Sequence, residues 1–281
     1  MDVSVIDYRS PDAPREFAAS LHDTGFAVLV NHPLDPHLVT RIYDEWNDLF
    51  ESDAMQRYLV DPGGQVGWFP PNRSETAKGS AVRDLKEFFH VYDWSIYPEE
   101  VSDAALRYSA SATSIATTLL GWVEENSPAG VRSGYSQPLP TMLDGSRRIL
   151  LRILRYPPLD GNEPADAMRA AAHKDINLLT VLPASNEAGL ELQASDGTWH
   201  QVPCDPGSIA VNAGEMLELA SNCHFPATRH RVVNPVGEEA SRYRMALPLF
   251  LQPADDVVLA DGRTASSFLD ERIRELRGVE S

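Results

Sequence analysis

Apolar residues at helical spacing predict two helices near the N-terminus, with a short strand between them. Phe17 and Leu21 lie four positions apart in "DAPREFAASLHDTG" and share one helical face. The continuous apolar run "FAVLV" at 26–30 then predicts a short buried strand. In "DPHLVTRIYDEWNDLF", Asp35 can cap a second helix and Pro36 can occupy its first position.

A loop and a third helix follow. Residues 61–80, "DPGGQVGWFPPNRSETAKGS", contain four glycines and three prolines without a sustained period, which predicts a loop. Helical spacing returns in "DAALRYSASATSIATTLLGWVEENS". The core contacts expected of this third helix are Leu106, Ile115, Leu119 and Trp122.

From about residue 147 the pattern changes to short β-rich runs separated by turn residues. These runs are "RILLRILRY", "NLLTVL", "GLELQ", "WHQVP", "SIAVNAG", "LELAS", "HRVVN" and "YRMALPLFLQP". Asp196 and Gly197 in "ASDGTW" favour a hairpin turn between two of them. A series of short strands with no long helices between them is typical of a sandwich or jelly roll.

We therefore expect a single domain over residues 1–281 that is mainly β with a helical N-terminal region. The helical region covers residues 1 to about 130, and the jelly-roll core covers about 147–255. A C-terminal helix over 265–278 closes the chain. Its inward-facing residues are Leu269, Ile273 and Leu276.

Composition and charge narrow the class of protein. The net charge of −17 opposes binding to nucleic acid or to an anionic membrane, because phosphate groups need a basic surface, and it favours a small-molecule substrate. No apolar stretch approaches the ~20 residues of a membrane span, and the N-terminus lacks a signal-peptide pattern. Cys204 and Cys223 are the only cysteines, too few for a disulfide framework. We expect a cytoplasmic protein, and the sequence leaves its oligomeric state open.

The stretch "AAHKDINLLTVL" contains candidate metal ligands. Its His173 and Asp175 are two residues apart, and on a strand they would point to one face while Lys174 points away. His230 in "ATRHRVVNP" is the best-placed third ligand. Two histidines and one carboxylate on one face of an octahedral ion leave positions open, which suits non-haem Fe(II) and dioxygen. An isolated H-x-D pair is common, so the spacing alone does not decide whether these residues bind a metal or are structural. Zinc can use the same ligands, so the spacing does not decide between iron and zinc either.

His224 is the main alternative to His230 as the third ligand. Its segment "SNCHFPATRH" has the character of a turn rather than a strand, which favours His230. The remaining histidines have ordinary helix, loop or strand surroundings and are expected to be structural: His22, His32, His37, His90 and His200.

Longer motifs along nearly the whole chain carry a family resemblance. They are "HKDINLLTVL", "GLELQASDGTWHQVPCDPGSIAVNAGEMLELASN", "HRVVNP" and "RMALPLFLQP", with "VIDY", "TGFAVLVNH" and "DLKEFFHV" nearer the N-terminus. Their combination resembles the isopenicillin N synthase-like family of Fe(II)/2-oxoglutarate-dependent oxygenases. The resemblance implies a double-stranded β-helix core, Fe(II) bound by His173, Asp175 and His230, and 2-oxoglutarate and O2 as cosubstrates.

The same resemblance identifies a cosubstrate-binding residue. Members of the family usually carry Arg-x-Ser near the last core strand, where the arginine pairs with the distal carboxylate of 2-oxoglutarate. The matching positions are Arg244 and Ala246. A guanidinium matches a carboxylate with two parallel hydrogen bonds, whereas the alanine lacks the hydroxyl donor of the serine.

Two candidate substrate-binding residues lie in "RILLRILRYPPLD". The stretch "RYPPLD" resembles that of isopenicillin N synthase, in which the tyrosine contacts substrate, and the matching residue is Tyr156. A period of two places Arg152 on the same face as Tyr156. An arginine among apolar neighbours needs an anionic partner, which is either a substrate carboxylate or a structural acid. With Arg155, these residues suggest a small carboxylate-bearing substrate.

Aromatic residues in the predicted loop offer a further candidate. Trp68 and Phe69 either cover the mouth of the barrel or pack against the N-terminal helices. Arg83 has the same two interpretations.

The sequence thus predicts an oxidoreductase, an Fe(II)/2-oxoglutarate-dependent dioxygenase that oxidises an unactivated C–H bond of a small carboxylate-bearing molecule in natural product biosynthesis. Hydroxylation is the default outcome, with desaturation and cyclisation as the other outcomes of the same chemistry. The first alternative is a 2-oxoglutarate-independent Fe(II) oxidase of the isopenicillin N synthase type. A more remote alternative is a non-catalytic β-sandwich binding protein.

Overall fold

The computed structural model describes residues 3–73, 82–164 and 166–276. Its strands are β1 (Val5–Asp7), β2 (Phe26–Val30), β3 (Gly67–Phe69), β4 (Glu87–Val91), β5 (Leu150–Tyr156), β6 (Ala170–His173), β7 (Leu179–Pro183), β8 (Leu190–Gln193), β9 (Trp199–Gln201), β10 (Ile209–Ala213), β11 (His230–Val232), β12 (Arg244–Ala246) and β13 (Leu249–Leu251). Its α-helices are α1 (Ala13–Thr24), α2 (Pro36–Glu51), α3 (Ala104–Asn126), α4 (Ala129–Arg132), α5 (Glu215–Ala220) and α6 (Ala265–Leu276). Its 3-10 helices are η1 (Asp53–Tyr58), η2 (Pro71–Arg73), η3 (Leu139–Leu143) and η4 (Gly237–Ser241).

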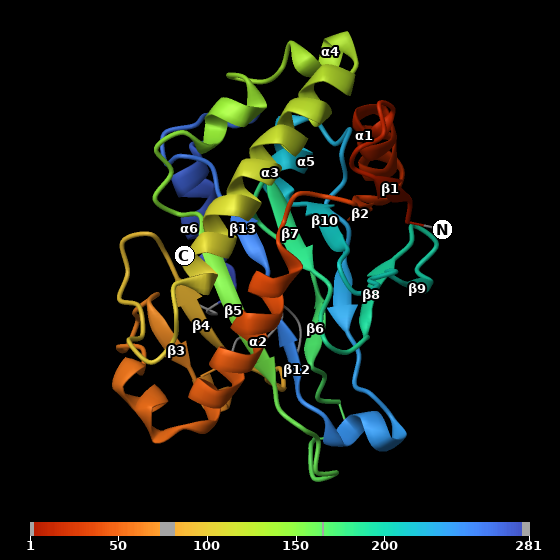
Figure 1. The fold of residues 1–281 in the computed structure, drawn as a ribbon. Helices are drawn as coiled ribbons and strands as arrows, with labels where there is room; N and C mark the ends of the chain where they lie inside the picture. The colour runs from red at the N-terminus through yellow and green to blue at the C-terminus, as the bar shows by residue number, and fades with distance from the viewer. Residues whose placement is uncertain (1–2, 74–81, 165, 277–281) are drawn as a thin grey trace.

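The strands form two sheets (Figure 1). The larger sheet has the order β1-β2-β10-β7-β13-β5-β4-β3, with β12 also paired to β5, and the smaller sheet has the order β6-β11-β8-β9. Apart from the parallel pair β1–β2, the pairings within these sheets are antiparallel. This is the double-stranded β-helix, or jelly roll, that the sequence predicted.

Alternate residues of the larger sheet point to two different faces, because successive side chains of a strand point in opposite directions. On β5, Leu151 and Ile153 belong to the apolar cluster that includes the buried residues of α1, α2 and α3. Leu154 and Tyr156 belong instead to the cluster between the two sheets. We call these the helical face and the interior face of the larger sheet, and the interior face is the one that meets the site described below.

Helices α2 and α3 cover the helical face (Figure 1). The Asp35 side chain accepts a hydrogen bond from the backbone N–H of His37 at 2.9 Å, so it caps α2 as predicted. On α3 the predicted core contacts Ile115 and Leu119 are buried and Trp122 is half-buried, but Leu106 is 38% exposed, so that expectation was wrong. Among the described residues, no helix is long and apolar enough to cross a lipid bilayer.

Two short segments differ from the sequence-based predictions. The predicted loop at 61–80 contains strand β3, which pairs with β4, and residues 74–80 of that prediction lie outside the described residues. The run "LELAS" at 217–221 was predicted as β-rich but belongs mostly to α5. Met216, Leu217 and Ala220 are buried there, a helical spacing that five residues are too short to reveal.

The C-terminal helix α6 packs Leu269 and Ile273 inward, as predicted. Leu269 is 8% exposed, and Ile273 is half-buried against the core. Of the predicted range, residues 277–278 and the Leu276 side chain lie outside the described part of the chain.

Candidate active site

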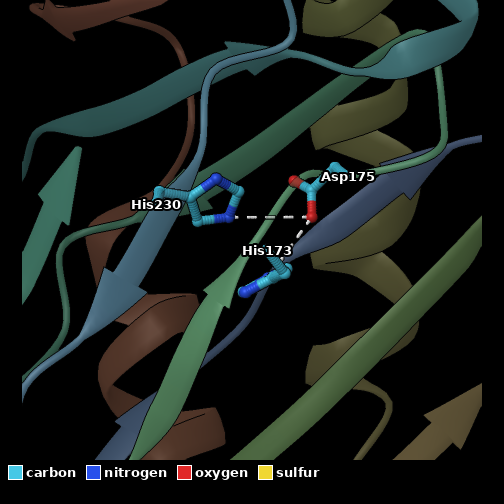
Figure 2. Close-up of side chains that lie close together, drawn as sticks. All are labelled: His173, Asp175 and His230. Atoms are coloured by element: carbon cyan, nitrogen blue, oxygen red, sulfur yellow. Dashed lines mark ion pairs between the residues drawn. The ribbon is translucent and has the colours of Figure 1, made fainter. Parts of the chain in front are cut away.

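His173, Asp175 and His230 converge between the two sheets, as Figure 2 shows. His173 ends β6 and His230 begins β11, and these two residues are register partners on neighbouring strands. Asp175 Oδ1 lies 3.7 Å from Nε2 of each histidine. The sequence-based argument that His173 and Asp175 share one strand face was wrong, because β6 ends at His173. Asp175 reaches the same point from the segment that follows.

Both histidines present a free nitrogen to this point. His173 Nδ1 lies 2.8 Å from the Ala171 carbonyl oxygen, and His230 Nδ1 lies 3.1 Å from the Thr228 carbonyl oxygen. A carbonyl only accepts hydrogen bonds, so each Nδ1 carries a hydrogen, and in the neutral ring this tautomer leaves the lone pair on Nε2. This second interaction is the usual way in which a protein fixes the orientation of a metal-binding imidazole.

The Asp175 carboxylate is fixed in the same manner. Its Oδ2 accepts hydrogen bonds from Thr180 Oγ1 at 2.5 Å and from Asn212 Nδ2 at 2.9 Å. Both donors lie on strands of the larger sheet, β7 and β10. These bonds leave Oδ1, the atom nearer both histidines, available to an ion.

The protonation states of His173 and Asp175 suit a cation. Burial raises the pKa of Asp175, but the neighbouring histidines and its two hydrogen bonds outweigh that effect and lower the pKa overall. Burial and the charge of His230 lower the pKa of His173 to about 4, although 38% of its side chain is exposed. At neutral pH the site is therefore a carboxylate beside a neutral imidazole, as metal binding requires.

The donor set fits a single ion. Two ligand atoms that each lie about 2.1 Å from one ion are at most about 4.2 Å apart, so separations of 3.7 Å are compatible with a shared ion. Lys174 pairs with Glu218 at 3.2 Å and is not one of the three converging residues. The structure brings the three predicted residues together, and their role as ligands remains a prediction.

His224 lies outside this cluster. Its ring stacks on that of His22, with 4.2 Å between the ring centres, and its carbonyl oxygen lies 2.7 Å from His22 Nδ1. It does not compete with His230 for the third position.

A cavity of about 930 Å³ opens beside the triad. His173 and Asp175 form part of its wall, and aromatic side chains form another part: Phe69, Tyr92, Trp94 and Phe250. Its basic lining residues among those described are Arg73, Arg83, Lys86, Arg147, Arg148, Arg152 and Lys174. Its acidic ones are Asp84, Asp175, Asp255 and Asp270. A basic cavity in a chain of net charge −17 favours an anionic ligand.

Arg152 is held in this wall by side chains of β4 and β13. Its guanidinium carbon lies 4.4 Å from the ring centre of Phe88 and 5.4 Å from that of Phe250. Its Nε donates to His90 Nε2 at 2.9 Å, while His90 Nδ1 donates to the Gln65 carbonyl oxygen at 2.8 Å. The sequence assigned His90 a purely structural role, which missed its place in the cavity wall. The alternation of "EFFHV", which places His90 on the face of Phe88, was the available signal.

The other predicted substrate contacts divide between two locations. Phe69 and Arg83 line the cavity, whereas Trp68 is 7% exposed and donates to Glu87 at 2.9 Å. Arg155 lies on the helical face and pairs with Glu87 at 2.9 Å, so the suggestion that it binds substrate was wrong. The physical reason is the period of two, which turns Arg155 away from the face of Arg152.

Arg244 lies deeper in the interior, beside Tyr156. The two residues are register partners on β12 and β5, and the Arg244 guanidinium carbon lies 5.3 Å from the Tyr156 ring centre. Both side chains are buried, and Tyr156 is absent from the described lining of the cavity. Arg244 is likewise absent from that lining, and the contact of Tyr156 with substrate stays a prediction.

Comparison with known proteins agrees with this geometry. The family model described as the 2OG-Fe(II) oxygenase superfamily matches residues 149–253, and the model described as non-haem dioxygenase in morphine synthesis N-terminal matches residues 3–109. The crystal structure of a candidate oxygenase from Shewanella oneidensis is 46% identical, covers 100% of both chains and superposes with a TM-score of 0.89. The chain belongs to the 2OG-Fe(II) oxygenase superfamily.

Curated relatives of this oxygenase include named dioxygenases. Gibberellin 2-beta-dioxygenase 2 of Arabidopsis thaliana is 25% identical over 254 residues, which cover 82% of this chain and 70% of the relative. Mugineic-acid 3-dioxygenase of Hordeum vulgare is 26% identical over 264 residues, which cover 88% of this chain and 71% of the relative. The protein is an Fe(II)/2-oxoglutarate-dependent dioxygenase that uses Fe(II), 2-oxoglutarate and O2. These matches disfavour the non-catalytic binding protein.

Proposed function

We propose that this oxygenase hydroxylates an unactivated C–H bond of a small carboxylate-bearing molecule. His173, Asp175 and His230 would hold Fe(II), and Arg244 would pair with the distal carboxylate of 2-oxoglutarate. Arg152 would bind the substrate carboxylate in the adjoining cavity. The overall reaction converts 2-oxoglutarate, O2 and R–H into succinate, CO2 and R–OH.

The environment of Arg152 is the observation that carries the proposal. Aromatic rings and the His90 imidazole hold its guanidinium in the same cavity wall as two of the three triad residues. These contacts fix the orientation of the guanidinium, so that less conformational entropy is lost when a carboxylate binds to it. The name of the relative mugineic-acid 3-dioxygenase, which specifies an acid, supports the same substrate class.

Bound iron and the protein side chains would have different roles in catalysis. Bound iron with its cosubstrates supplies the oxidising power, and the protein supplies position and shielding. Arg152 would fix one end of the substrate, so that a C–H bond elsewhere in the molecule faces the triad. The aromatic lining residues Phe69 and Phe250 would displace water from the reacting carbon.

Paired substrates test the carboxylate assignment. Candidate small acids and their methyl esters are compared by succinate production in the Fe(II)-loaded enzyme. We expect acids to be turned over and esters to react poorly, and we expect Arg152→Met to lower kcat/KM for the acid about 10- to 100-fold while leaving the ester rate unchanged. Equal rates for acid and ester in the native enzyme would exclude the assignment.

Arg231 provides a matched control for Arg152. Its guanidinium also stacks on an aromatic ring, 4.0 Å from the centre of Trp199, but it lies in the smaller sheet and pairs with Glu191 at 2.8 Å. Arg231→Met should therefore leave the preference for the acid unchanged.

Product stoichiometry tests the choice of cosubstrate. One succinate per oxidised product is expected from 2-oxoglutarate-dependent hydroxylation. Product formed without succinate would instead indicate an oxidase of the isopenicillin N synthase type, and loss of two hydrogens without added oxygen would indicate desaturation or cyclisation.

We also propose that residues 1–281 form one oxygenase domain acting in specialised metabolism in the cytoplasm. The first point is supported by the larger sheet, in which β4 of the N-terminal region pairs with β5 of the core. Limited proteolysis tests it, with a single protected fragment expected. The cytoplasmic location rests on the sequence-based expectation and is tested by cell fractionation.

A further inference from the structure

Two buried arginines near the interior face keep N–H groups without partners. Arg169 is 0% exposed, and among the described residues its Nε and Nη1 have no hydrogen-bond partner. Arg244 is 3% exposed, and its Nη1 likewise has no partner within the described chain. Buried charged donors without partners are costly, so native proteins rarely keep them without a ligand or a functional reason.

The bonds that these arginines do make lie close together. Arg169 Nη2 donates to the Arg242 carbonyl oxygen at 2.9 Å, two residues before Arg244. Arg244 Nε donates to the Glu187 carbonyl oxygen at 3.0 Å. Both arginines thus donate hydrogen bonds to backbone carbonyl oxygens, which carry no formal negative charge.

The carboxylate of Glu187, which acts electrostatically on Arg169, already has a partner. The Glu187 carboxylate lies 3.4 Å from Nη1 of Arg242, a third arginine. Burial lowers the pKa of Arg169 and the charge of Arg244 lowers it further, while Tyr156 and Glu187 raise it. Three guanidinium groups with one carboxylate leave the cluster with an excess of positive charge, and an entering carboxylate would relieve it.

Ala246, close to Arg244, lacks a hydrogen-bond donor that the family pattern provides. Ala246 is buried two residues beyond Arg244, on the same face of β12, where the family pattern has a serine hydroxyl. Its methyl group cannot donate a hydrogen bond. Arg169 adds unpartnered N–H donors beside the same arginine.

We propose that Arg169 is a second cosubstrate-binding arginine, which joins Arg244 on the distal carboxylate of 2-oxoglutarate and replaces the hydroxyl that Ala246 lacks. The proposal rests on the proposed function, since it needs 2-oxoglutarate at this site. It assigns specificity for a five-carbon dicarboxylate to two guanidinium groups rather than to an arginine and a serine.

The affinity of the Fe(II) protein for two oxo acids tests this assignment. Under anaerobic conditions, 2-oxoglutarate is titrated against the visible charge-transfer band of its iron complex, and 2-oxobutyrate, which lacks the distal carboxylate, is titrated in parallel. We expect Arg169→Met to raise the Kd of 2-oxoglutarate about 10- to 100-fold and to leave that of 2-oxobutyrate unchanged. Ala246→Ser in the Arg169→Met background should recover part of the lost affinity.

Controls separate this effect from misfolding and from loss of iron. Arg169→Met should bind Fe(II) with native stoichiometry, and Arg231→Met should keep the native Kd for 2-oxoglutarate. Arg169→Lys keeps the charge but not the fork, so an intermediate Kd is expected. This variant provides the test should the methionine variant fail to fold.

Three results would overturn the proposal in distinguishable ways. A native Kd for 2-oxoglutarate in both Arg169 variants would remove Arg169 from the site while leaving the proposed function intact. Equal weakening of both oxo acids would show that Arg169 acts on the fold or on the iron end of the site. No charge-transfer band in the native protein would overturn the proposed function and this inference together.

Discussion

The two faces of the larger sheet treat buried arginines in opposite ways. On the helical face, each guanidinium nitrogen of Arg155 has a side-chain partner: Nη1 bonds Glu87 at 2.9 Å, Nη2 bonds Glu51 at 2.5 Å, and Nε bonds Asn47 at 3.0 Å. Near the interior face, Arg169 and Arg244 retain nitrogens without partners in the described residues. This chain can satisfy a buried arginine completely where the arginine holds helix to sheet. Unsatisfied arginines in the same molecule therefore indicate where a ligand completes the structure.

The difference extends to what substitution should do. A change on the helical face should affect the free energy of unfolding and leave ligand binding to the folded molecules intact. A change on the interior face should affect binding and leave stability intact or improved.

Asp175→Ala should have the largest effect on the interior side of this comparison. It removes the carboxylate that lies 3.7 Å from both histidine nitrogens, so we expect loss of Fe(II) binding and a fall in turnover of more than about 1,000-fold. Iron content per chain and succinate production measure the two effects. Native iron content in both Asp175→Ala and His230→Ala would contradict the assignment of the triad.

Arg155→Met should have the largest effect on the helical side. Removing the arginine leaves Glu87, whose side chain is 7% exposed, without its charged partner, and breaking a buried pair in this way costs about 3–5 kcal/mol. Urea denaturation measures the loss, and the Kd of 2-oxoglutarate in the folded fraction should not change. The double variant Arg155→Met/Glu87→Gln should recover much of the stability. A change in Kd without a change in stability would reverse the comparison.

Arg169→Met should produce a smaller effect with the opposite sign. In the absence of 2-oxoglutarate it relieves the repulsion between two buried guanidinium groups, so a gain of about 1 kcal/mol in the free energy of unfolding is expected. Added 2-oxoglutarate should then raise the melting temperature of the native Fe(II) protein more than that of the variant. A variant less stable than the native protein without ligand would mean that Arg169 is structural, like Arg155.

The pH dependence at Glu87 should be the smallest effect. Burial raises the pKa of Glu87, and its bonds from Arg155 and Trp68 oppose the shift without cancelling it. The folded state therefore binds this proton more tightly than the unfolded state, so its contribution to stability is fully present below the ordinary value of 4.5 and is lost as pH rises through the raised pKa. The free energy of unfolding of Glu87→Gln minus that of the native protein, measured across this range, should be a difference that grows with pH. A difference that shrinks with pH would show that the arginine outweighs the burial.

Local patterns were sufficient for much of the fold. The Asp35 cap of α2, the apolar run of β2 and the "ASDGTW" turn between β8 and β9 each depend on neighbours within a few residues, so the sequence predicted them. Strand β3 was missed because a strand of three residues among glycines and prolines has no period to detect. The α5 helix was missed because its apolar spacing fits a strand over so short a run.

The site was predictable only in part for a related reason. The pattern and the family resemblance singled out His173, Asp175 and His230, which converge as expected. Arg169 precedes β6 and has no motif of its own, and its importance arises from contacts with residues 73 and more positions away. His90 depends similarly on Arg152, which is 62 positions away in the chain. Such relationships exist only after folding.

The mixed origin of the cavity wall separates two kinds of evolutionary change. The described part of residues 64–94 contributes aromatic and basic groups to it, alongside Arg152 of β5, whereas the triad, Arg169 and Arg244 come from residues 169–244. Mutations in the earlier segment can alter which molecules are accepted while the oxidising machinery is inherited intact. Exchanging that segment between homologues is accordingly a rational route to enzymes with new selectivity.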